Sequence, residues 1–164
     1  MADRFSMTSP QITEGARIAD EQVFNIGCHG GNMSPALQWR NPPEETRSFA
    51  VTVLDLDVPS GGDWWHWIII NIPASVTGLV KGAGNPQAHL APSGTVQLRN
   101  DFGKSGYGGP CPPSGDKPHR YEFTVYALNI AKLPLDESTP AITAAYSLRE
   151  HMLDKVSLMA TYSR

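Results

Sequence analysis

The sequence has no long apolar run, no cluster of basic residues and only two cysteines among its 164 residues. Apolar runs such as residues 67–70 are far too short to span a bilayer. The net charge is −3 and no run of lysine or arginine occurs, so neither nucleic acid nor an anionic membrane surface is expected as a partner. The N-terminal segment lacks the apolar stretch of a secretory signal, and a cytoplasmic location is therefore predicted.

The two cysteines, Cys28 and Cys111, fit no disulfide framework and are predicted to be free thiols. Glycine and proline, with 15 and 14 residues, are more frequent than in an average protein. The chain therefore turns often, and long helices cannot dominate it. Its length suits one hydrophobic core, so a single domain is expected over residues 1–164.

Five segments have the β-branched and aromatic composition of β-strands. In residues 48–55 both alternating sets are mostly apolar, which indicates a strand buried on both faces. The other segments are residues 65–72, 95–99, 121–128 and 156–162. Because helices do not alternate regularly with these strands, a parallel sheet is not expected. The pattern predicts a mainly β protein, a two-sheet antiparallel β-sandwich with one or two peripheral helices.

One helix is predicted over residues 141–154, where Thr139 can cap the N-terminus and Pro140 suits the first helical position. The residues expected to form its buried stripe are Ile142, Ala145, Tyr146, Met152 and Leu153.

Two carboxylates follow the first buried strand in residues 55–59, Asp-Leu-Asp-Val-Pro. Asp55 ends a run that should be buried, and a buried carboxylate needs a partner or becomes protonated. Asp57 stands two residues before Pro59, so a turn-capping role is an equally good interpretation for it.

The next segment, residues 64–67, places three tryptophans and one histidine in four positions. If Trp65 and Trp67 face one side of a strand, Trp64 and His66 share the other side. An aromatic wall beside an imidazole predicts a partly apolar pocket with one titratable group. Taken alone, His66 would be better interpreted as a core histidine bonded to a carbonyl.

The third segment is the loop 106–113, Gly-Tyr-Gly-Gly-Pro-Cys-Pro-Pro, which precedes His119 and Tyr121. Its glycines let a ligand approach the backbone, successive amides in such loops bind anions, and its prolines stiffen it. No Gly-Lys-Ser/Thr sequence and no helix follow, so the loop is neither a phosphate loop nor a dinucleotide-binding loop.

Together and in this order, these segments resemble the phosphatidylethanolamine-binding protein family. The Asp-x-Asp-x-Pro turn, the Trp-x-His segment, the Gly-Pro-x-Pro-Pro loop and the His-Arg-Tyr strand entry carry the resemblance. Residues 32–39, 71–73 and 100–103 are similar to its bacterial Raf-kinase-inhibitor-like branch. One departure is Leu56, where the family usually has proline, but both carboxylates of the turn are kept.

The resemblance implies a β-sandwich with an anion pocket at one end, and it implies a homodimer. No catalytic residue, cofactor or metal is expected. Family members bind phosphate-like groups and some inhibit kinases or proteases, so the expected partners are a small anion (phosphate, phosphoethanolamine or a nucleotide-like ligand) and a kinase or protease. Because the chain ends on the 156–162 strand, a more open pocket is implied than in members with a C-terminal helix. The expected ligand-binding residues are Asp55, Asp57, Pro59, Trp64, His66, Gly109, Cys111, Pro112, His119 and Tyr121.

The chemistry of these residues suits an anion, which needs hydrogen-bond donors in a partly dry pocket. His66 and His119 offer ring N–H groups, Tyr121 offers a hydroxyl and the glycine loop offers amides. Asp55 would hold one imidazole in a fixed tautomer and stabilise its charged form. Phosphate affinity is therefore predicted to fall as pH rises through the histidine range.

Three alternatives stay open. A cysteine hydrolase would use Cys111, His119 and Asp55, although Cys111 lies between prolines rather than at a helix N-terminus. A carbohydrate-binding module would expose the tryptophans of residues 64–67 as stacking platforms. A zinc site, without the usual ligand spacing, would use Cys28, His29, His66 and His119.

Overall fold

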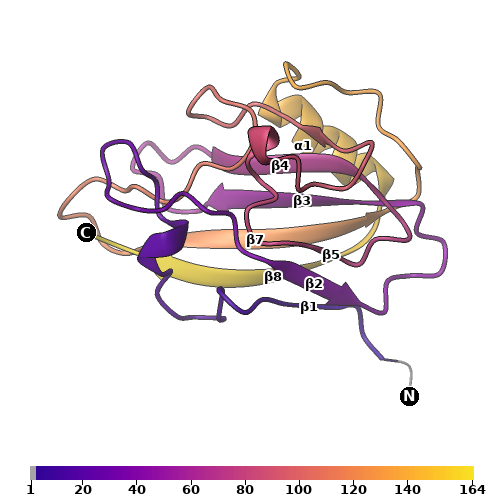
Figure 1. Ribbon diagram of the computed structural model, residues 1–164, viewed down its shortest axis with the longest axis horizontal. Helices are drawn as coiled ribbons and strands as arrows, with labels where there is room; N and C mark the ends of the chain where they lie inside the picture. Colours follow the sequence, from indigo (N-terminus) through magenta and orange to yellow (C-terminus); the bar gives the residue numbers. More distant parts are fainter. Residues whose placement is uncertain (1–2) are drawn as a thin grey trace.

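An antiparallel sheet of five strands forms the centre of the computed structural model, which describes residues 3–164 (Figure 1). Each strand pairs with its neighbour in the antiparallel sense. In order across the sheet the strands are β6 (Val96–Gln97), β4 (Trp64–Pro73), β3 (Ser48–Asp55), β7 (His119–Leu128) and β8 (Met152–Tyr162). All five segments with strand-like composition therefore belong to this one sheet.

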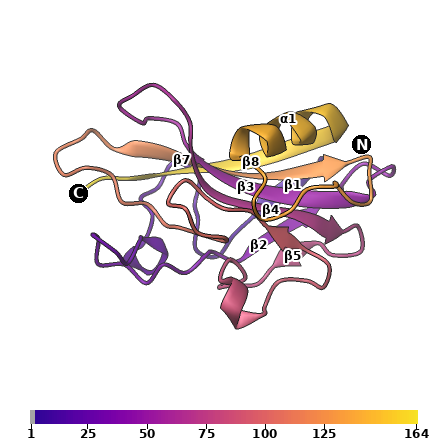
Figure 2. The ribbon, with the colours of Figure 1, turned by 90° about the horizontal axis from the view of Figure 1, so that it is seen from above.

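A smaller antiparallel sheet and the only α-helix of the described residues cover opposite faces of the five-stranded sheet (Figure 2). The small sheet consists of β1 (Ser6–Thr8), β2 (Leu37–Arg40) and β5 (Gly78–Leu79). The helix is α1 (Ala141–His151), and two 3-10 helices, η1 (Asp20–Gln22) and η2 (Pro86–Ala88), lie in the loops. This arrangement confirms the predicted two-sheet antiparallel sandwich with peripheral helices.

Strand β3 is buried on both faces, as its two apolar residue sets predict. On one face Phe49 and Val53 share a core with Trp39 of β2. On the other face Ala50 shares a second core with Leu148 of α1. Burial of each large apolar side chain contributes roughly 1.5–3 kcal/mol. The two cores therefore hold β3 and its neighbours as a rigid frame that ends at Asp55.

The helix is shorter than predicted and contacts the sheet through a different face. It ends at His151, and the chain continues directly into β8. Its buried side chains are Ala144 and Leu148, four residues apart, so this narrow stripe faces the sheet. The residues predicted to be buried that are exposed instead are Ile142, Tyr146, Met152 and Leu153.

Cys28 and Cys111 form a disulfide bond with their Cα atoms 5.9 Å apart, so the prediction of free thiols is wrong. The two cysteines are 83 residues apart in the sequence, and only the fold brings their loops together. Beside the disulfide, the amide of Phe24 donates to the carbonyl of Pro110 at 3.0 Å. Disulfides persist in oxidising compartments, so this bond counts against the cytoplasmic location expected from the sequence.

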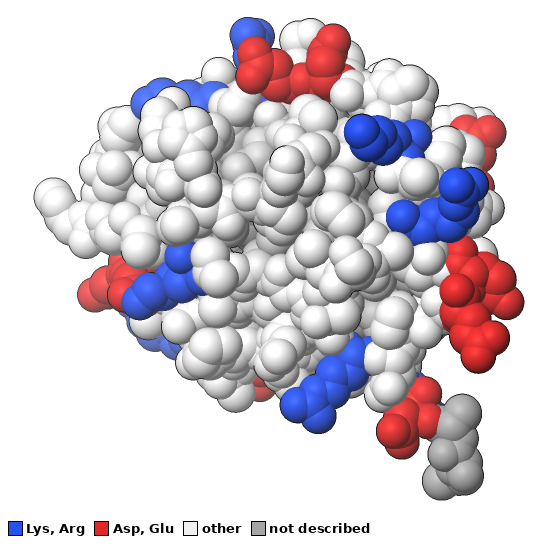
Figure 3. All heavy atoms as spheres, turned by 45° about the vertical axis from the view of Figure 1, so that its right-hand side comes forward, with Lys and Arg blue, Asp and Glu red and all other residues white. Residues whose placement is uncertain are grey.

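Within residues 3–164 no helix has the length and apolar character needed to cross a membrane. On the face shown in Figure 3, basic side chains lie apart from one another and are interspersed with acidic ones around a largely uncharged centre. That face carries no continuous basic surface.

Candidate ligand-binding site

Strand pairing brings the three predicted segments together at one end of the five-stranded sheet. Asp55, the last residue of β3, pairs with Trp64 at the start of β4 and with Tyr121 near the start of β7. His119 begins β7 and lies two residues before Tyr121, so both side chains face the same side of the sheet. The antiparallel register thus assembles groups that are far apart in the sequence.

A bulge in β4 sets the direction of His66. Val53 pairs with Trp67 and Leu54 pairs with Trp65, which leaves His66 as an extra residue between the two pairs. Trp65 and Trp67 therefore belong to different cores, contrary to the expectation that they share a side. A β-bulge of this kind re-aims a side chain, and here it turns His66 toward the space beside Asp55.

A pocket of about 240 Å³ opens between these strand ends and the proline-rich loop. Eight of the ten predicted site residues line it, together with three residues that the sequence did not predict. The lining residues are Asp55, Val58, Pro59, Trp64, His66, Phe102, Cys111, Pro112, Pro113, His119 and Tyr121.

Asp57 and Gly109 are the two predicted residues that do not line the pocket. Asp57 faces outward and binds Arg120 through two hydrogen bonds of 2.9 Å, and these bonds hold the pKa of Asp57 below its usual range. The amide of Gly109 donates to Oδ1 of Asn32 at 2.8 Å, so it is already engaged. A side chain at Gly109 would collide with the carbonyl oxygen of Gln22, so glycine is needed there for close packing.

His119 is held between two carboxylates. Its Nδ1 donates to Oδ2 of Asp55 at 2.7 Å, and its Nε2 donates to Oδ2 of Asp116 at 3.0 Å. Burial alone would lower the pKa of His119, but the hydrogen bonds and charges of the two carboxylates outweigh burial and raise it. The site therefore favours an imidazolium whose two N–H groups both have partners within the chain.

His66 has the opposite electrostatic character. Its side chain is buried, and Nδ1 donates to the carbonyl of Gly108 at 2.6 Å. Burial lowers its pKa, so the neutral ring with a proton on Nδ1 is favoured. Nε2 then carries a lone pair and accepts hydrogen bonds, whereas the sequence predicted His66 as a donor. The carbonyl partner agrees with the interpretation of His66, taken alone, as a core histidine bonded to a carbonyl.

Tyr121 contributes a buried hydroxyl that has no hydrogen-bond partner among the described residues. Burial raises the pKa of Tyr121, and the charge of Asp55 raises it further, so the hydroxyl stays protonated. A buried polar group without a partner costs free energy. Tyr121 lines the pocket, but its hydroxyl is itself buried, so a ligand reaches this donor only if the pocket wall shifts.

The sequence interpretation missed Phe102 and Asp116. The ring of Phe102 stacks on Phe24 with centroids 4.1 Å apart and meets the edges of Trp64 and His66 at 5.5 and 5.4 Å. Phe102 lies in the segment 100–103, which carried part of the family resemblance, so a signal existed for it. For Asp116 the only signal was its place three residues before His119.

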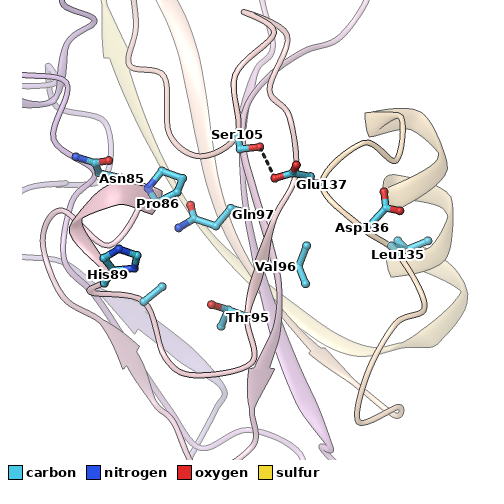
Figure 4. Close-up of a pocket in the computed structure, with 11 residues that line it drawn as sticks. Asn85, Pro86, His89, Thr95, Val96, Gln97, Ser105, Leu135, Asp136 and Glu137 are labelled. Atoms are coloured by element: carbon cyan, nitrogen blue, oxygen red, sulfur yellow. Dashed lines mark hydrogen bonds between the residues drawn. The ribbon is translucent and has the colours of Figure 1, made fainter.

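A second hollow, of about 420 Å³, lies beside the edge strand β6 (Figure 4). Gln97 and Val96 of β6 form its floor, and Ser105 and Glu137 approach each other at one side, with 3.4 Å between Oγ and Oε2. None of the ten predicted residues lines it. The chemistry expected from the sequence is therefore concentrated in the smaller pocket at the strand ends.

Two findings about the alternatives follow from the same geometry. Cys111 is bonded to Cys28, so neither sulfur is a free thiolate for hydrolysis or for zinc in this oxidised form. Trp67 is fully buried and Trp65 is 9% exposed, so they cannot serve as carbohydrate-stacking platforms.

An antiparallel sandwich with a small, partly apolar pocket at the end of its central sheet defines a class of ligand-binding β proteins rather than a single protein. Comparison with known proteins narrows the class. The family model described as phosphatidylethanolamine-binding protein matches residues 8–163. The chain belongs to the phosphatidylethanolamine-binding protein family.

Bacterial relatives support the more specific resemblance. The chain is 46% identical to the UPF0098 protein YbcL of Escherichia coli, over 98% of this chain and 88% of YbcL, and 39% identical to the UPF0098 protein YbhB, over 96% and 99%. It is 32% identical to LppC of Mycobacterium tuberculosis, which is named as a lipoprotein, over 98% and 73%. The crystal structure of E. coli YbcL, described as a new member of the mammalian PEBP family, matches with a TM-score of 0.95 and 45% identity, over 98% of both chains.

Proposed function

We propose that this protein binds a small oxyanion, such as phosphate or a phosphorylated headgroup, in the pocket between Asp55, His66, His119 and Tyr121. Membership of a ligand-binding family supports a pocket with a ligand. The observation that carries the proposal is the placement of His119 at the pocket wall, where Asp55 accepts from its Nδ1 at 2.7 Å and helps to raise its pKa.

The polar groups divide the recognition of such a ligand between them. Nε2 of His119 donates to a ligand oxygen in place of Asp116, Tyr121 donates to another, and the neutral His66 accepts from a protonated phosphate oxygen. Charge-assisted hydrogen bonds of this kind are shorter and stronger than neutral ones. The rings of Trp64 and Phe102 exclude water, which strengthens these bonds because the local dielectric constant is lower.

Isothermal titration calorimetry with inorganic phosphate, phosphoethanolamine and adenosine monophosphate tests the proposal. His119→Ala and His66→Ala should each weaken phosphate binding, the former by about tenfold or more because a charge-assisted donor is lost. Arg120→Ala is the matched control, since Arg120 follows His119 on the same strand but points outward to Asp57. Equal affinities of all four proteins would refute the proposed site.

We propose binding rather than catalysis as the activity. The nucleophile that the hydrolase alternative requires is absent while Cys111 is bonded to Cys28. Hydrolysis of p-nitrophenyl esters by the reduced protein, lost in Cys111→Ser, would support the enzyme alternative instead.

Partners and location remain predictions that accompany this proposal. The family resemblance predicts a homodimer of a single domain over residues 1–164, and modulation of a kinase or a protease. Analytical ultracentrifugation checks the dimer, and inhibition assays with and without phosphate check the modulation. The cytoplasmic location is checked by fractionation, and recovery of the chain with its disulfide from an oxidising compartment would overturn it.

A further inference from the structure

The two carboxylates that hold His119 differ in how firmly they are fixed. Asp55 is buried, with a side chain 6% exposed, and its second oxygen accepts from the amide of Asp57 at 2.8 Å. The side chain of Asp116 is 29% exposed. Among residues 3–164, His119 is the only residue that hydrogen-bonds to the side chain of Asp116. Asp55 is therefore fixed in place by burial and two hydrogen bonds. Asp116 is held by a single side-chain hydrogen bond, which a ligand could replace.

The loop that carries Asp116 leaves this residue free to move away. Asp116 follows Gly115 in an exposed turn, and its amide makes a long hydrogen bond of 3.3 Å to the carbonyl of Pro113. Gly115 has a φ of +88°, and a side chain added there would meet nothing within 4 Å. A rotation of the Asp116 side chain toward water therefore requires no change in the buried frame.

Two glycine amides of the pocket loop are already engaged inside the protein. The amide of Gly108 donates to the carbonyl of His66 at 2.9 Å, and the amide of Gly109 donates to Asn32. The residues at positions 110, 112 and 113 are prolines, which have no amide N–H. The amide of Cys111, between these prolines, and the hydroxyl of Tyr121 have no partner among residues 3–164, and both are neutral donors. Nε2 of His119 is the charged donor of the site, and Asp116 occupies it.

From this geometry we propose that Asp116 determines the anion affinity of the pocket as a tethered competitor. Its carboxylate occupies the Nε2–H of His119, and an incoming oxyanion must displace it. Binding is then an exchange of one oxyanion for another on the same imidazolium, so His119 keeps its charge throughout. This inference rests on the proposed binding of oxyanions at His119, and it adds the residue that sets the affinity.

The exchange also predicts which ligands the pocket rejects. A competitor held by the chain acts at an effective concentration on the order of millimolar. An oxyanion that makes only the His119 contact does not overcome it. A ligand that also uses the hydroxyl of Tyr121 and the acceptor on His66 does, so Asp116 selects oxyanions that contact all three groups.

The test compares Asp116→Asn with wild type by phosphate calorimetry, and uses Glu45→Gln as the matched control. Glu45 lies in an exposed turn, and its substitution removes the same charge. Asp116→Asn should bind phosphate about tenfold more tightly than wild type, because the tethered competitor is weakened. Glu45→Gln should stay within about twofold of wild type, because salt screens distant surface charges. Asp116→Ser provides a second variant with the same expectation.

The outcomes separate this inference from the proposed function. If wild type binds phosphate, His119→Ala does not, and both Asp116 variants bind no tighter than wild type, the competitor is refuted and the binding site stands. If neither wild type nor the Asp116 variants bind phosphate, both proposals fail. Tighter binding by the Asp116 variants that is lost again when His119→Ala is added supports both.

Discussion

Two ion pairs lie at the same end of the central sheet and have opposite surroundings. Asp55 pairs with His119 on the inner side of the sheet end, and Asp57 pairs with Arg120 on the outer side. Asp55 is the last residue of β3 and Asp57 follows it by two residues, and each meets a cationic side chain at the start of β7. The side chains of the inner pair are 6% and 5% exposed, and those of the outer pair are 31% and 51% exposed.

Environment rather than residue type decides what a charge pair does. The outer pair is hydrated and bidentate, so salt and water weaken its effect on stability. The inner pair is shielded from water, and the contact with Asp55 helps to raise the pKa of His119. Strand alternation turns His119 to the pocket side and Arg120 to the outer side, and the turn after β3 brings Asp57 to the outer side with Arg120.

The largest expected effect concerns the rim beside the inner pair. Cys28→Ser combined with Cys111→Ser should lower the free energy of unfolding by about 4 kcal/mol, as expected for a crosslink across such a long loop. The outer pair is half exposed and does not line the pocket that Cys111 lines, so adding Asp57→Ala should cause little further loss. Urea denaturation of the three proteins measures this, and an unchanged midpoint in the double serine variant would contradict it.

The next effect separates the two pairs directly. Asp55→Ala leaves His119 buried without its main partner and should lower the free energy of unfolding by about 3 kcal/mol. Asp57→Ala exposes Arg120 to water, which already hydrates it, and should shift the thermal midpoint far less. Differential scanning calorimetry provides the measurement. Equal shifts for the two variants would show that burial does not make the inner pair more important for stability than the outer pair.

The dependence of stability on pH should also differ between the pairs. The pKa of His119 is raised, so its stabilisation is complete below its usual value of 6.5 and is lost as pH rises through the folded value. The pKa of Asp57 is lowered, so its stabilisation is present above 3.8 and is lost as pH falls. His119→Gln should therefore flatten the alkaline limb of the stability curve, and Asp57→Asn the acid limb. Chemical denaturation from pH 3 to pH 9 measures both limbs.

Tyr121→Phe should have the smallest effect on stability and a clear effect on binding. The substitution removes a buried hydroxyl without a partner, so the free energy of unfolding should change by less than about 1 kcal/mol or rise slightly. Phosphate affinity should fall several-fold because one donor is lost. A large loss of stability with unchanged affinity would mean that the hydroxyl serves the fold alone.

Much of the fold could be predicted because local patterns carry it. The strands at residues 48–55 and 121–128 have apolar residues at fixed alternation, and both lie in the central sheet. The buried face of the helix could not be predicted from hydrophobicity. The small Ala144 packs against the sheet and is buried, whereas the larger and more apolar Ile142 is exposed. The disulfide joins residues 83 positions apart, and nothing in the local sequence at Cys28 indicates its partner.

For the site, the sequence indicated which residues meet but not the state in which they meet. Asp55, His66 and His119 lie together because each stands at or near a strand end. The neutral ring of His66 depends on a carbonyl and a bulge, which only the three-dimensional register creates. The role of Asp116 depends on the path of an exposed loop, and loop geometry is weakly specified by composition.

The most direct test of the account is nuclear magnetic resonance of the histidine ring nitrogens at neutral pH, with and without phosphate. The account predicts a charged His119 ring whose Nε2 resonance moves on phosphate addition, and a neutral His66 ring with its proton on Nδ1. A neutral His119 ring, or Nε2 resonances that phosphate leaves unmoved at saturating concentration, would contradict it.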